Sequence, residues 1–326
     1  MSKRWSTWFT NTTMNECSEP LGPTAVLLLA HGAPSRVDVI PLYLKNIRGG
    51  TESSTEVIQL IRERYEAIGG SSPLLEITQN QAKEVERFLN QNGGNFKVYV
   101  GMRNWSPYIS DVVGQMVKDG IERVLALCLA PQYSTWSTER YFNALNDTQK
   151  KNSVTKLPIQ FISTWANQPS LIDAFVERYN QAMDRMREKG HEEVHTIFTV
   201  HSIPAESTEL GDPYEEEYDR TVQAIVERVQ PFRWYKAYQS QGMIPVPWLG
   251  PTVEHTFDRI ARIGSKPVLM VPVGFVSDHI EILYDIDIQF AQYAESKNLK
   301  LYRTESLNCS PLFIEALAAV VWEHLL

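Results

Sequence analysis

The chain has 326 residues, of which 43% are hydrophobic and 21% charged, and this ordinary globular balance excludes a disordered protein. Its 31 basic and 39 acidic residues give a net charge of −8, which argues against a nucleic-acid binder, since such proteins carry a basic surface. No apolar run approaches the roughly 18 residues of a membrane-spanning helix.

The cysteines and the first segment indicate the compartment. Cys17, Cys128 and Cys309 form no C-x-x-C pair, which is typical of a reducing cytoplasm. Three thiols are also too few for the four thiolates that usually hold an iron–sulfur cluster. Residues 1–22 form a polar tail without the apolar core of a signal peptide. We therefore expect a cytoplasmic protein without such a cluster.

Eight short apolar or β-branched runs predict strands that are buried on both faces of a sheet. In chain order they cover residues 25–30, 96–101, 123–129, 158–163, 195–200, 235–239, 267–271 and 299–302.

Helix signals lie between these runs. Ser54 is expected to cap a helix that ends at Gly69–Gly70. Ser106–Pro107 and Ser310–Pro311 each have the pattern of an N-cap followed by a first-turn proline. Further helices are expected to open near Pro169, Tyr214, Pro251 and Ser277. The alternation of strands and helices predicts an α/β protein with parallel sheets.

The two halves of the chain resemble each other. The segment VLLLAHGAP of the first half is similar to TIFTVHSIP of the second, and VLALCLAPQYST is similar to VLMVPVGFVSD. This repetition predicts two Rossmann-like domains, each a four-stranded parallel sheet flanked by helices. We place them at residues 23–163 and 164–309, with a helix over 310–326 that packs back on the first domain.

One segment has no counterpart in the second half. Residues about 32–95 form an insertion after the first strand, at the edge of a parallel sheet where α/β proteins bind ligands. We expect this insertion to form a lip over the substrate.

His201 follows a predicted strand, in FTVHSIPAESTELGDPY, where it could bind metal or accept a proton. A structural histidine is the alternative. Glu281 and Asp285 lie four residues apart in GFVSDHIEILYDID, on one predicted helical face after a neighbouring strand. Asp278 and His279 precede them. An imidazole facing a row of carboxylates suits a divalent metal, whereas a solvated acidic face is the plain alternative.

Other candidates surround this pair. His31 holds the matching position in the first half, with Gly32 free to bring the backbone close to a ligand. Arg48 and Arg64 could bind carboxylates, although Arg64 could equally pair with Glu63 or another helix carboxylate on the surface. Aromatic residues near the strand ends could stack on a flat ligand or fill the core. These are Trp105, Tyr133, Trp136, Tyr141 and Trp248.

Four long segments resemble ferrochelatases: RERYEAIGGSSPLLEIT, HSIPAESTELGDPYEEEYDRT, YQSQGMIPVPWLGPTVE and PVGFVSDHIEILYDID. The similarity runs from about residue 25 to residue 326. It implies a chelatase-like fold with a porphyrin cleft between the two domains. It also implies a lyase of haem biosynthesis that inserts Fe²⁺ into a porphyrin.

The resemblance implies roles residue by residue. His201 and Glu281 would bind Fe²⁺ and remove the pyrrole protons, and Asp285 would extend a metal or proton route. The two catalytic side chains would face each other across a gap wide enough for a flat tetrapyrrole. The substrate-binding positions would be His31, Arg48, Arg64, Tyr65, Ser72 and Tyr141, with His31 on the opposite face of the macrocycle.

The resemblance favours coproporphyrin III as the substrate. Protoporphyrin IX, a cobalt or nickel tetrapyrrole chelatase and a non-catalytic haem or porphyrin carrier are the alternatives. Fe²⁺ would be a substrate, and no tightly bound cofactor is expected. We expect a monomer with no nucleic-acid partner and no transmembrane segment.

Overall fold

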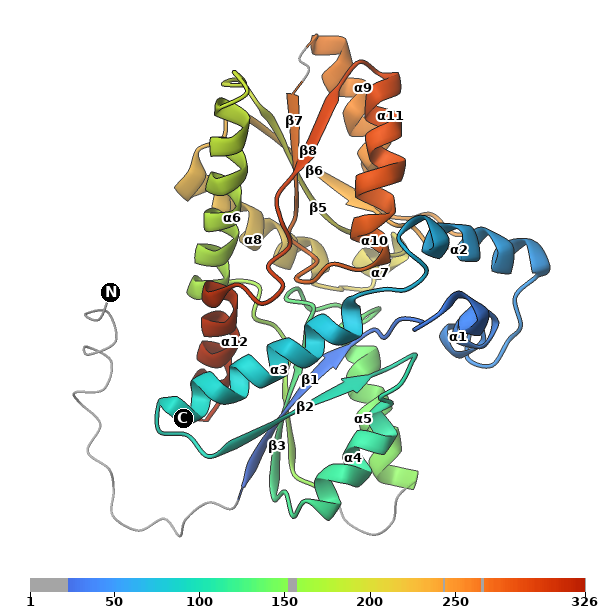
Figure 1. The fold of residues 1–326 in the computed structure, drawn as a ribbon, viewed down its shortest axis with the longest axis vertical. Coiled ribbons are helices and arrows are strands. Elements are labelled where there is room, and N and C mark those ends of the chain that lie inside the picture. Colours follow the sequence, from blue (N-terminus) through green and yellow to red (C-terminus); the bar gives the residue numbers. More distant parts are fainter. Residues whose placement is uncertain (1–22, 152–156, 243, 265–266, 326) are drawn as a thin grey trace.

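The computed structural model describes residues 23–151, 157–242, 244–264 and 267–325 (Figure 1). The predicted tail of residues 1–22 lies outside them. Two four-stranded parallel sheets lie one above the other in Figure 1. The strands of the first sheet are β1 (Thr24–Ala30), β2 (Phe96–Met102), β3 (Arg123–Cys128) and β4 (Ile159–Ile162). Those of the second are β5 (His195–His201), β6 (Arg233–Gln239), β7 (Pro267–Pro272) and β8 (Lys300–Arg303).

Both sheets have the same strand order. The first runs β2-β1-β3-β4 and the second β6-β5-β7-β8, so each strand of one half has a counterpart at the same place in the other. All seven residues of β1 are buried, as are six of the seven in β5, because both strands have neighbours on either side and helices on both faces. The predicted fold class and the eight predicted strands are confirmed.

Helices cover both faces of each sheet. The helices are α1 (Ile40–Ile47), α2 (Thr55–Ala67), α3 (Leu74–Gln91), α4 (Ile109–Lys118), α5 (Thr138–Lys151), α6 (Pro169–Arg187), α7 (Glu206–Glu209), α8 (Tyr214–Val229), α9 (Val253–Ile263), α10 (Ile280–Leu283), α11 (Ala291–Ser296) and α12 (Pro311–Glu323), with a 3₁₀ turn η1 (Val37–Val39) and a π-helix η2 (Asp285–Phe290). None of the helices in the described residues is long and apolar enough to cross a membrane.

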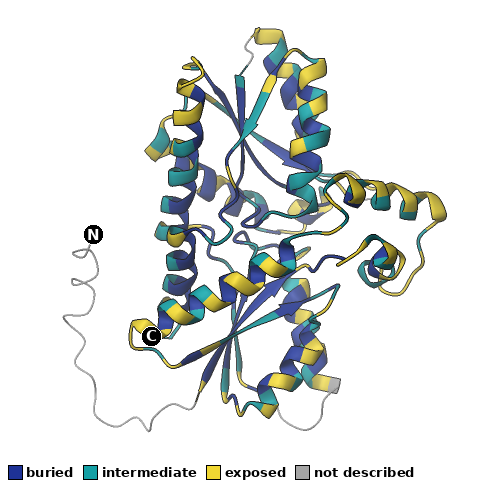
Figure 2. Ribbon diagram, in the orientation of Figure 1, coloured by how far each residue is buried: buried dark blue, intermediate teal, exposed yellow. Residues whose placement is uncertain are grey.

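One apolar core joins the two halves. Side chains from one face of β1, such as Leu28, lie in the same cluster as Phe198 of β5, with Phe175 of α6 and Phe313 of α12 between them. Helix α12 contacts both α3 and α6. Figure 2 shows the buried residues continuing from one sheet to the other along these helices. The shared core fixes the position of one sheet relative to the other, and therefore the site that lies where their strands end.

Three predicted helix starts differ from the structure. Helix α4 begins at Ile109 rather than at Ser106–Pro107, because the carbonyl of Pro107 still accepts a hydrogen bond from the end of β2, at Met102. Helix α9 begins at Val253 with Thr252 as its cap, and α10 begins at Ile280. The starts at Ser54 and at Ser310–Pro311 are confirmed.

The connection between β1 and β2 has two parts. Helices α1 and α2 project to the side of the two sheets, around a small core of Ile40, Leu44 and Tyr65. Ile280 of the second half packs against this core. Helix α3 instead lies on β2 and β1, in the place that α8 takes in the second half. Only α1 and α2 of residues 32–95 therefore form a projecting arm.

Candidate active site

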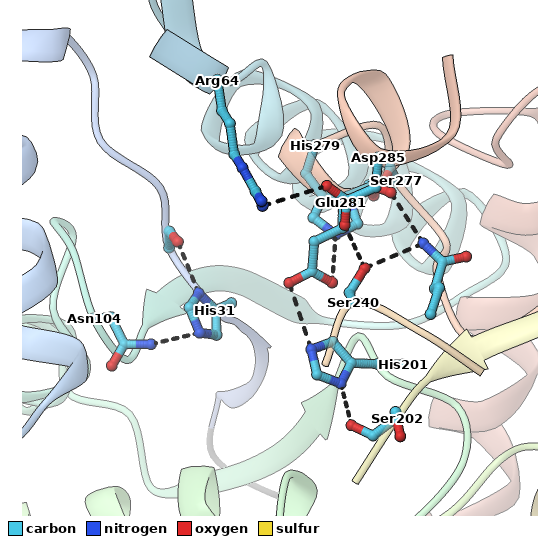
Figure 3. A network of polar contacts seen from close by, with 12 residues as sticks. His31, Arg64, Asn104, His201, Ser202, Ser240, Ser277, His279, Glu281 and Asp285 are labelled. Atoms are coloured by element: carbon cyan, nitrogen blue, oxygen red, sulfur yellow. Dashed lines mark hydrogen bonds and ion pairs between the residues drawn. The ribbon is translucent and has the colours of Figure 1, made fainter. Parts of the chain in front are cut away.

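His201 is the last residue of β5, at the edge of the sheet where the strands end. Its Nδ1 is hydrogen-bonded to the backbone carbonyl of Ser202. Because a carbonyl can only accept, Nδ1 carries the proton, and in the neutral ring the lone pair lies on Nε2. The backbone thus orients the basic nitrogen of His201 toward the space at the end of the sheet (Figure 3).

Glu281 lies between two imidazoles. Its Oε1 is 3.6 Å from Nε2 of His201, and its Oε2 is 3.6 Å from Nε2 of His279. Burial raises the pKa of Glu281, but the charge of His201 and the contact with His279 outweigh burial and bring this pKa to about 2. The carboxylate is therefore ionised at neutral pH.

The gap between His201 and Glu281 is narrower than predicted. A flat macrocycle between two side chains would need about 7 Å, or twice the carbon contact distance of roughly 3.5 Å. The two groups are 3.6 Å apart. They face each other as expected but share one side of the site, because the neighbouring strands β5 and β7 deliver both of them to the same edge.

Asp285 is buried beside Glu281 and has two further partners. Ser240 donates a hydrogen bond to its Oδ2 at 2.5 Å, and Nη1 of Arg64 lies 3.8 Å from its Oδ1. Burial and the charge of Glu281 raise the pKa of Asp285 to about 6. The shared helical face was predicted on α-helical spacing, but α10 ends at Leu283 and Asp285 opens the π-helix η2, a form frequent at functional sites.

Asp278 does not belong to this acidic group. It accepts hydrogen bonds from Ser306 at 2.7 Å and from Asn308 at 2.8 Å, and Arg303 lies 3.4 Å away. These partners turn Asp278 toward the loop after β8, away from Glu281 and Asp285.

His31 follows β1 in the first half and points toward the same space (Figure 3). Its Nδ1 lies 3.1 Å from the carbonyl of Gly32, and its Nε2 lies 3.0 Å from Nδ2 of Asn104. Both ring nitrogens thus have partners in the neutral form. Burial and the nearby Arg103 lower the pKa of His31 to about 4, so the ring is neutral at pH 7.

The glycine after His31 allows a close approach within the protein rather than to a ligand. Gly32 has a φ of +86°, and a side chain there would come within 2.8 Å of the backbone nitrogen of Trp105. The close approach predicted at this glycine is therefore made by the segment after β2, which also supplies Asn104.

The remaining predicted substrate residues are spread along the arm and α5. Arg48 ends α1 and donates to Ser53 at 3.3 Å. Ser72 accepts from the backbone of Leu74. Tyr65 of α2 is buried, and its hydroxyl is without a hydrogen bond in the described part of the chain. Tyr141 is buried in α5.

Arg64 has a carboxylate partner within the protein. It reaches from α2 to Asp285 and lies over the ring of Tyr284 at 5.2 Å. This partner differs from the surface carboxylate expected as the alternative, because Asp285 is buried in the second half. Nε of Arg64 is buried without a hydrogen bond among the described residues, which leaves it a free donor.

Asn104 and Ser240 are site residues that the sequence did not single out, and His279 was noted before Glu281 without a role. His279 is buried among polar partners, with Nδ1 2.9 Å from the carbonyl of Ser277. Burial lowers its pKa, but Glu281 outweighs burial and the net shift is upward. The spacing of His279 and Glu281, two residues apart before a short helix, was the one available signal.

The site offers two ligands to a metal rather than a closed cage. No group of three or more His, Cys, Asp or Glu in the described chain is arranged to hold a metal ion. The lone pair of His201 Nε2 and the carboxylate of Glu281 converge on one point, where a proton or a divalent cation would be stabilised. Two protein ligands suit a metal ion that is bound briefly and takes its remaining ligands from water or from the molecule that receives it.

Comparisons with known proteins extend this picture. Residues 23–325 match the family model Ferrochelatase. A ferrochelatase of Acidobacterium capsulatum is 41% identical over 90% of this chain and 92% of its own length. The coproporphyrin III ferrochelatase of Bacillus subtilis is 36% identical over 92% of this chain and 97% of its own. Among solved structures, SirB of Bacillus subtilis covers 92% of the chain with a TM-score of 0.56 at 12% identity, and CbiX gives 0.54 at 10%.

Two sheets of one topology, with histidine and carboxylate side chains at the strand ends, define a protein of the chelatase fold. The chain belongs to the ferrochelatase family. It is thus an enzyme of haem biosynthesis, a lyase that inserts a metal into a porphyrin.

Proposed function

We propose that this enzyme inserts Fe²⁺ into coproporphyrin III, with His201 and Glu281 at the point of insertion. The observation that carries this proposal is the convergence of His201 Nε2 and Glu281 Oε1 at 3.6 Å. The choice of porphyrin is supported by relatives named coproporphyrin III ferrochelatase, which are 35–37% identical to this chain over 91–92% of it.

The reaction exchanges two pyrrole N–H protons for one Fe²⁺. The neutral His201, oriented by Ser202, accepts a pyrrole proton at Nε2. Glu281 remains ionised and stabilises the positive charge that forms on the ring beside it. While Nε2 carries this proton it has no lone pair for a metal, so Fe²⁺ moves to the pyrrole nitrogens from the carboxylate of Glu281. His201 releases the first proton to solvent and then accepts the second. The two protons leave for solvent, and the two side chains return to their starting state.

Asp285 is suited to carry protons away from this pair. Its pKa of about 6 lies near neutral pH, so it can take up and release a proton without a large free-energy cost. Ser240 orients one of its oxygens, and Arg64 lies beside the other. We assign Asp285 to a proton route, and we assign His31 to the face of the macrocycle opposite His201.

The experiment is anaerobic incubation with Fe²⁺ and each porphyrin in turn, followed by absorbance. We expect faster metallation of coproporphyrin III than of protoporphyrin IX. Faster turnover of protoporphyrin IX would overturn the choice of porphyrin, and insertion of Co²⁺ or Ni²⁺ but not Fe²⁺ would overturn the choice of metal. Binding of porphyrin without any insertion would point to a carrier instead.

We further propose a cytoplasmic monomer without a resident cofactor or iron–sulfur cluster. The chain has three cysteines, and burial raises the pKa of the Cys128 thiol to about 12, so that it is a poor thiolate donor. Light scattering on the purified protein tests the monomer, and a measurement of its metal content tests the absence of a bound cofactor or cluster.

A further inference from the structure

Two arginines that are not among the predicted substrate residues lie at the strand ends of the first sheet. Arg103 follows β2, and Arg140 lies in the first turn of α5, after β3. The backbone nitrogen of Arg103 donates to the carbonyl of Ala30, and that of Asn104 donates to the carbonyl of His31. Arg103 is thus held directly beside His31 of the site.

Both guanidinium groups lie on aromatic rings. Cζ of Arg103 is 5.4 Å from the ring centre of Tyr141, and Cζ of Arg140 is 4.3 Å from that of Trp136. Arg140 and Tyr141 are consecutive residues of α5, so both stacks involve the start of this helix. A guanidinium held on a ring by its face keeps its N–H edge free for a bidentate contact with a carboxylate.

Neither arginine has an acidic partner. In the described ranges, no carboxylate lies within ion-pair distance of Arg103 or Arg140, although acids outnumber bases in the chain by eight. Within the part of the chain that the structure describes, the side chain of Arg103 makes one hydrogen bond, from Nε to Asn104 at 3.3 Å, and its two terminal nitrogens have no hydrogen-bond partner there. Burial and the charge of Arg103 lower the pKa of Arg140, which is consistent with two like charges close together.

We propose that Arg103 and Arg140 bind a side-chain carboxylate of the porphyrin, as a contact separate from Arg48 and Arg64. This inference rests on the proposed function and deepens it, because it identifies a determinant for porphyrins that carry more than two carboxylates. An anion between the two guanidiniums would offset their mutual repulsion and satisfy their free N–H groups. Coproporphyrin III, with four propionates, presents more such groups than protoporphyrin IX, with two.

The test compares Arg140→Gln, Arg103→Gln, the double variant and Arg140→Lys on coproporphyrin III and on its tetramethyl ester. The matched control is Arg187→Gln, which makes the same charge change at an exposed position of α6. Each Gln variant is expected to raise KM for the free acid about tenfold, the ratio that ~1.4 kcal/mol produces. Metallation of the ester should not change. The KM of Arg140→Lys should lie between those of the unaltered enzyme and Arg140→Gln, because lysine keeps the charge but cannot make the bidentate contact.

If both arginines hold one carboxylate, the double variant should lose less than the product of the two single losses. The proposal would be overturned if the Arg103 and Arg140 variants had the same KM as Arg187→Gln. It would also be overturned if they lost as much activity on the ester as on the free acid. A parallel titration of coproporphyrin fluorescence without iron reports binding alone. Failure of the proposed function would appear as no metallation by the unaltered enzyme, whereas failure of this inference would appear as unchanged affinity in the titration.

Discussion

Nε2 of His201 lies 3.6 Å from Oε1 of Glu281, although 80 positions separate them in the chain. The two residues meet because β5 and β7 are neighbours and run parallel, so both chain segments leave the sheet at one edge. The pair therefore lies on one side of the site, and His31 of the first half lies on the other side (Figure 3).

Replacing His201 by alanine removes the base. We expect kcat for Fe²⁺ insertion to fall by a factor of about 10² or more, within the range for general bases, while the porphyrin still binds. Stopped-flow absorbance and a fluorescence titration measure the two quantities. His191→Ala is the control, because His191 contacts Tyr302, away from the Glu281 cluster. Turnover within a few-fold of the unaltered enzyme would remove His201 from the mechanism.

Glu281→Gln keeps the shape of the side chain and removes its charge. Insertion should fall by about 10² or more, because no anion then stabilises the cation on His201. The porphyrin affinity should change less than threefold. A loss of porphyrin affinity with kcat retained would show that Glu281 binds the macrocycle instead.

We expect His279, which lies 3.6 Å from Glu281, to act on this carboxylate rather than on the substrate. His279→Ala removes one of the contacts that lower the pKa of Glu281, so this pKa should rise from about 2 toward its ordinary value. Carboxyl ¹³C NMR titration of labelled glutamate measures the shift. We expect a reduction in kcat of about tenfold, as for a positioning residue. An unmoved Glu281 resonance would contradict this role.

Asp285 destabilises the fold when it is ionised. Its pKa is raised from 3.8 to about 6, so the folded state favours the protonated form, and stability is lost as pH rises through 6. Asp285→Asn should therefore raise the free energy of unfolding at pH 8, by up to about 3 kcal/mol. The gain should shrink as pH falls from 6 toward 4.

Urea unfolding at pH 5 and pH 8 tests this sign. Asp147→Asn, on the exposed face of α5, provides a control for the change of charge. A gain that is equal at both pH values would show that hydrogen bonding, and not ionisation, dominates at Asp285.

Asp212 joins the two halves. This buried carboxylate of the second half accepts hydrogen bonds from Ser134 Oγ at 2.9 Å, from the backbone of Thr135 at 2.9 Å and from its hydroxyl at 2.6 Å. Asp212→Ala would leave these donors unpaired and should cost about 2–4 kcal/mol of unfolding free energy. Asp184→Ala, an exposed acid on α6, should cost less than about 0.5 kcal/mol. An equal loss of unfolding free energy in the two variants would show that the hydrogen bonds of Asp212 to Ser134 and Thr135 do not contribute to stability.

The amino-acid sequence by itself determined the strands, most of the helices and the likeness of the two halves. Short apolar runs such as that of β1 identify strands locally, and the matching positions of His31 and His201 reveal the repeat. The helix starts at Ser54 and Ser310 were also local signals and were confirmed. The start at Ser106–Pro107 failed because a contact with the end of β2 prevails over the capping pattern.

Only the tertiary structure decided how the charged groups pair. It placed Glu281 at 3.6 Å from His201, gave Arg64 a buried partner in Asp285 and turned Asp278 toward Asn308. Each of these outcomes depends on burial and on neighbours distant in the chain, which no local pattern encodes. Hydrophobic periodicity is a property of a single segment, whereas a pKa or an ion pair depends on the tertiary environment of the side chain.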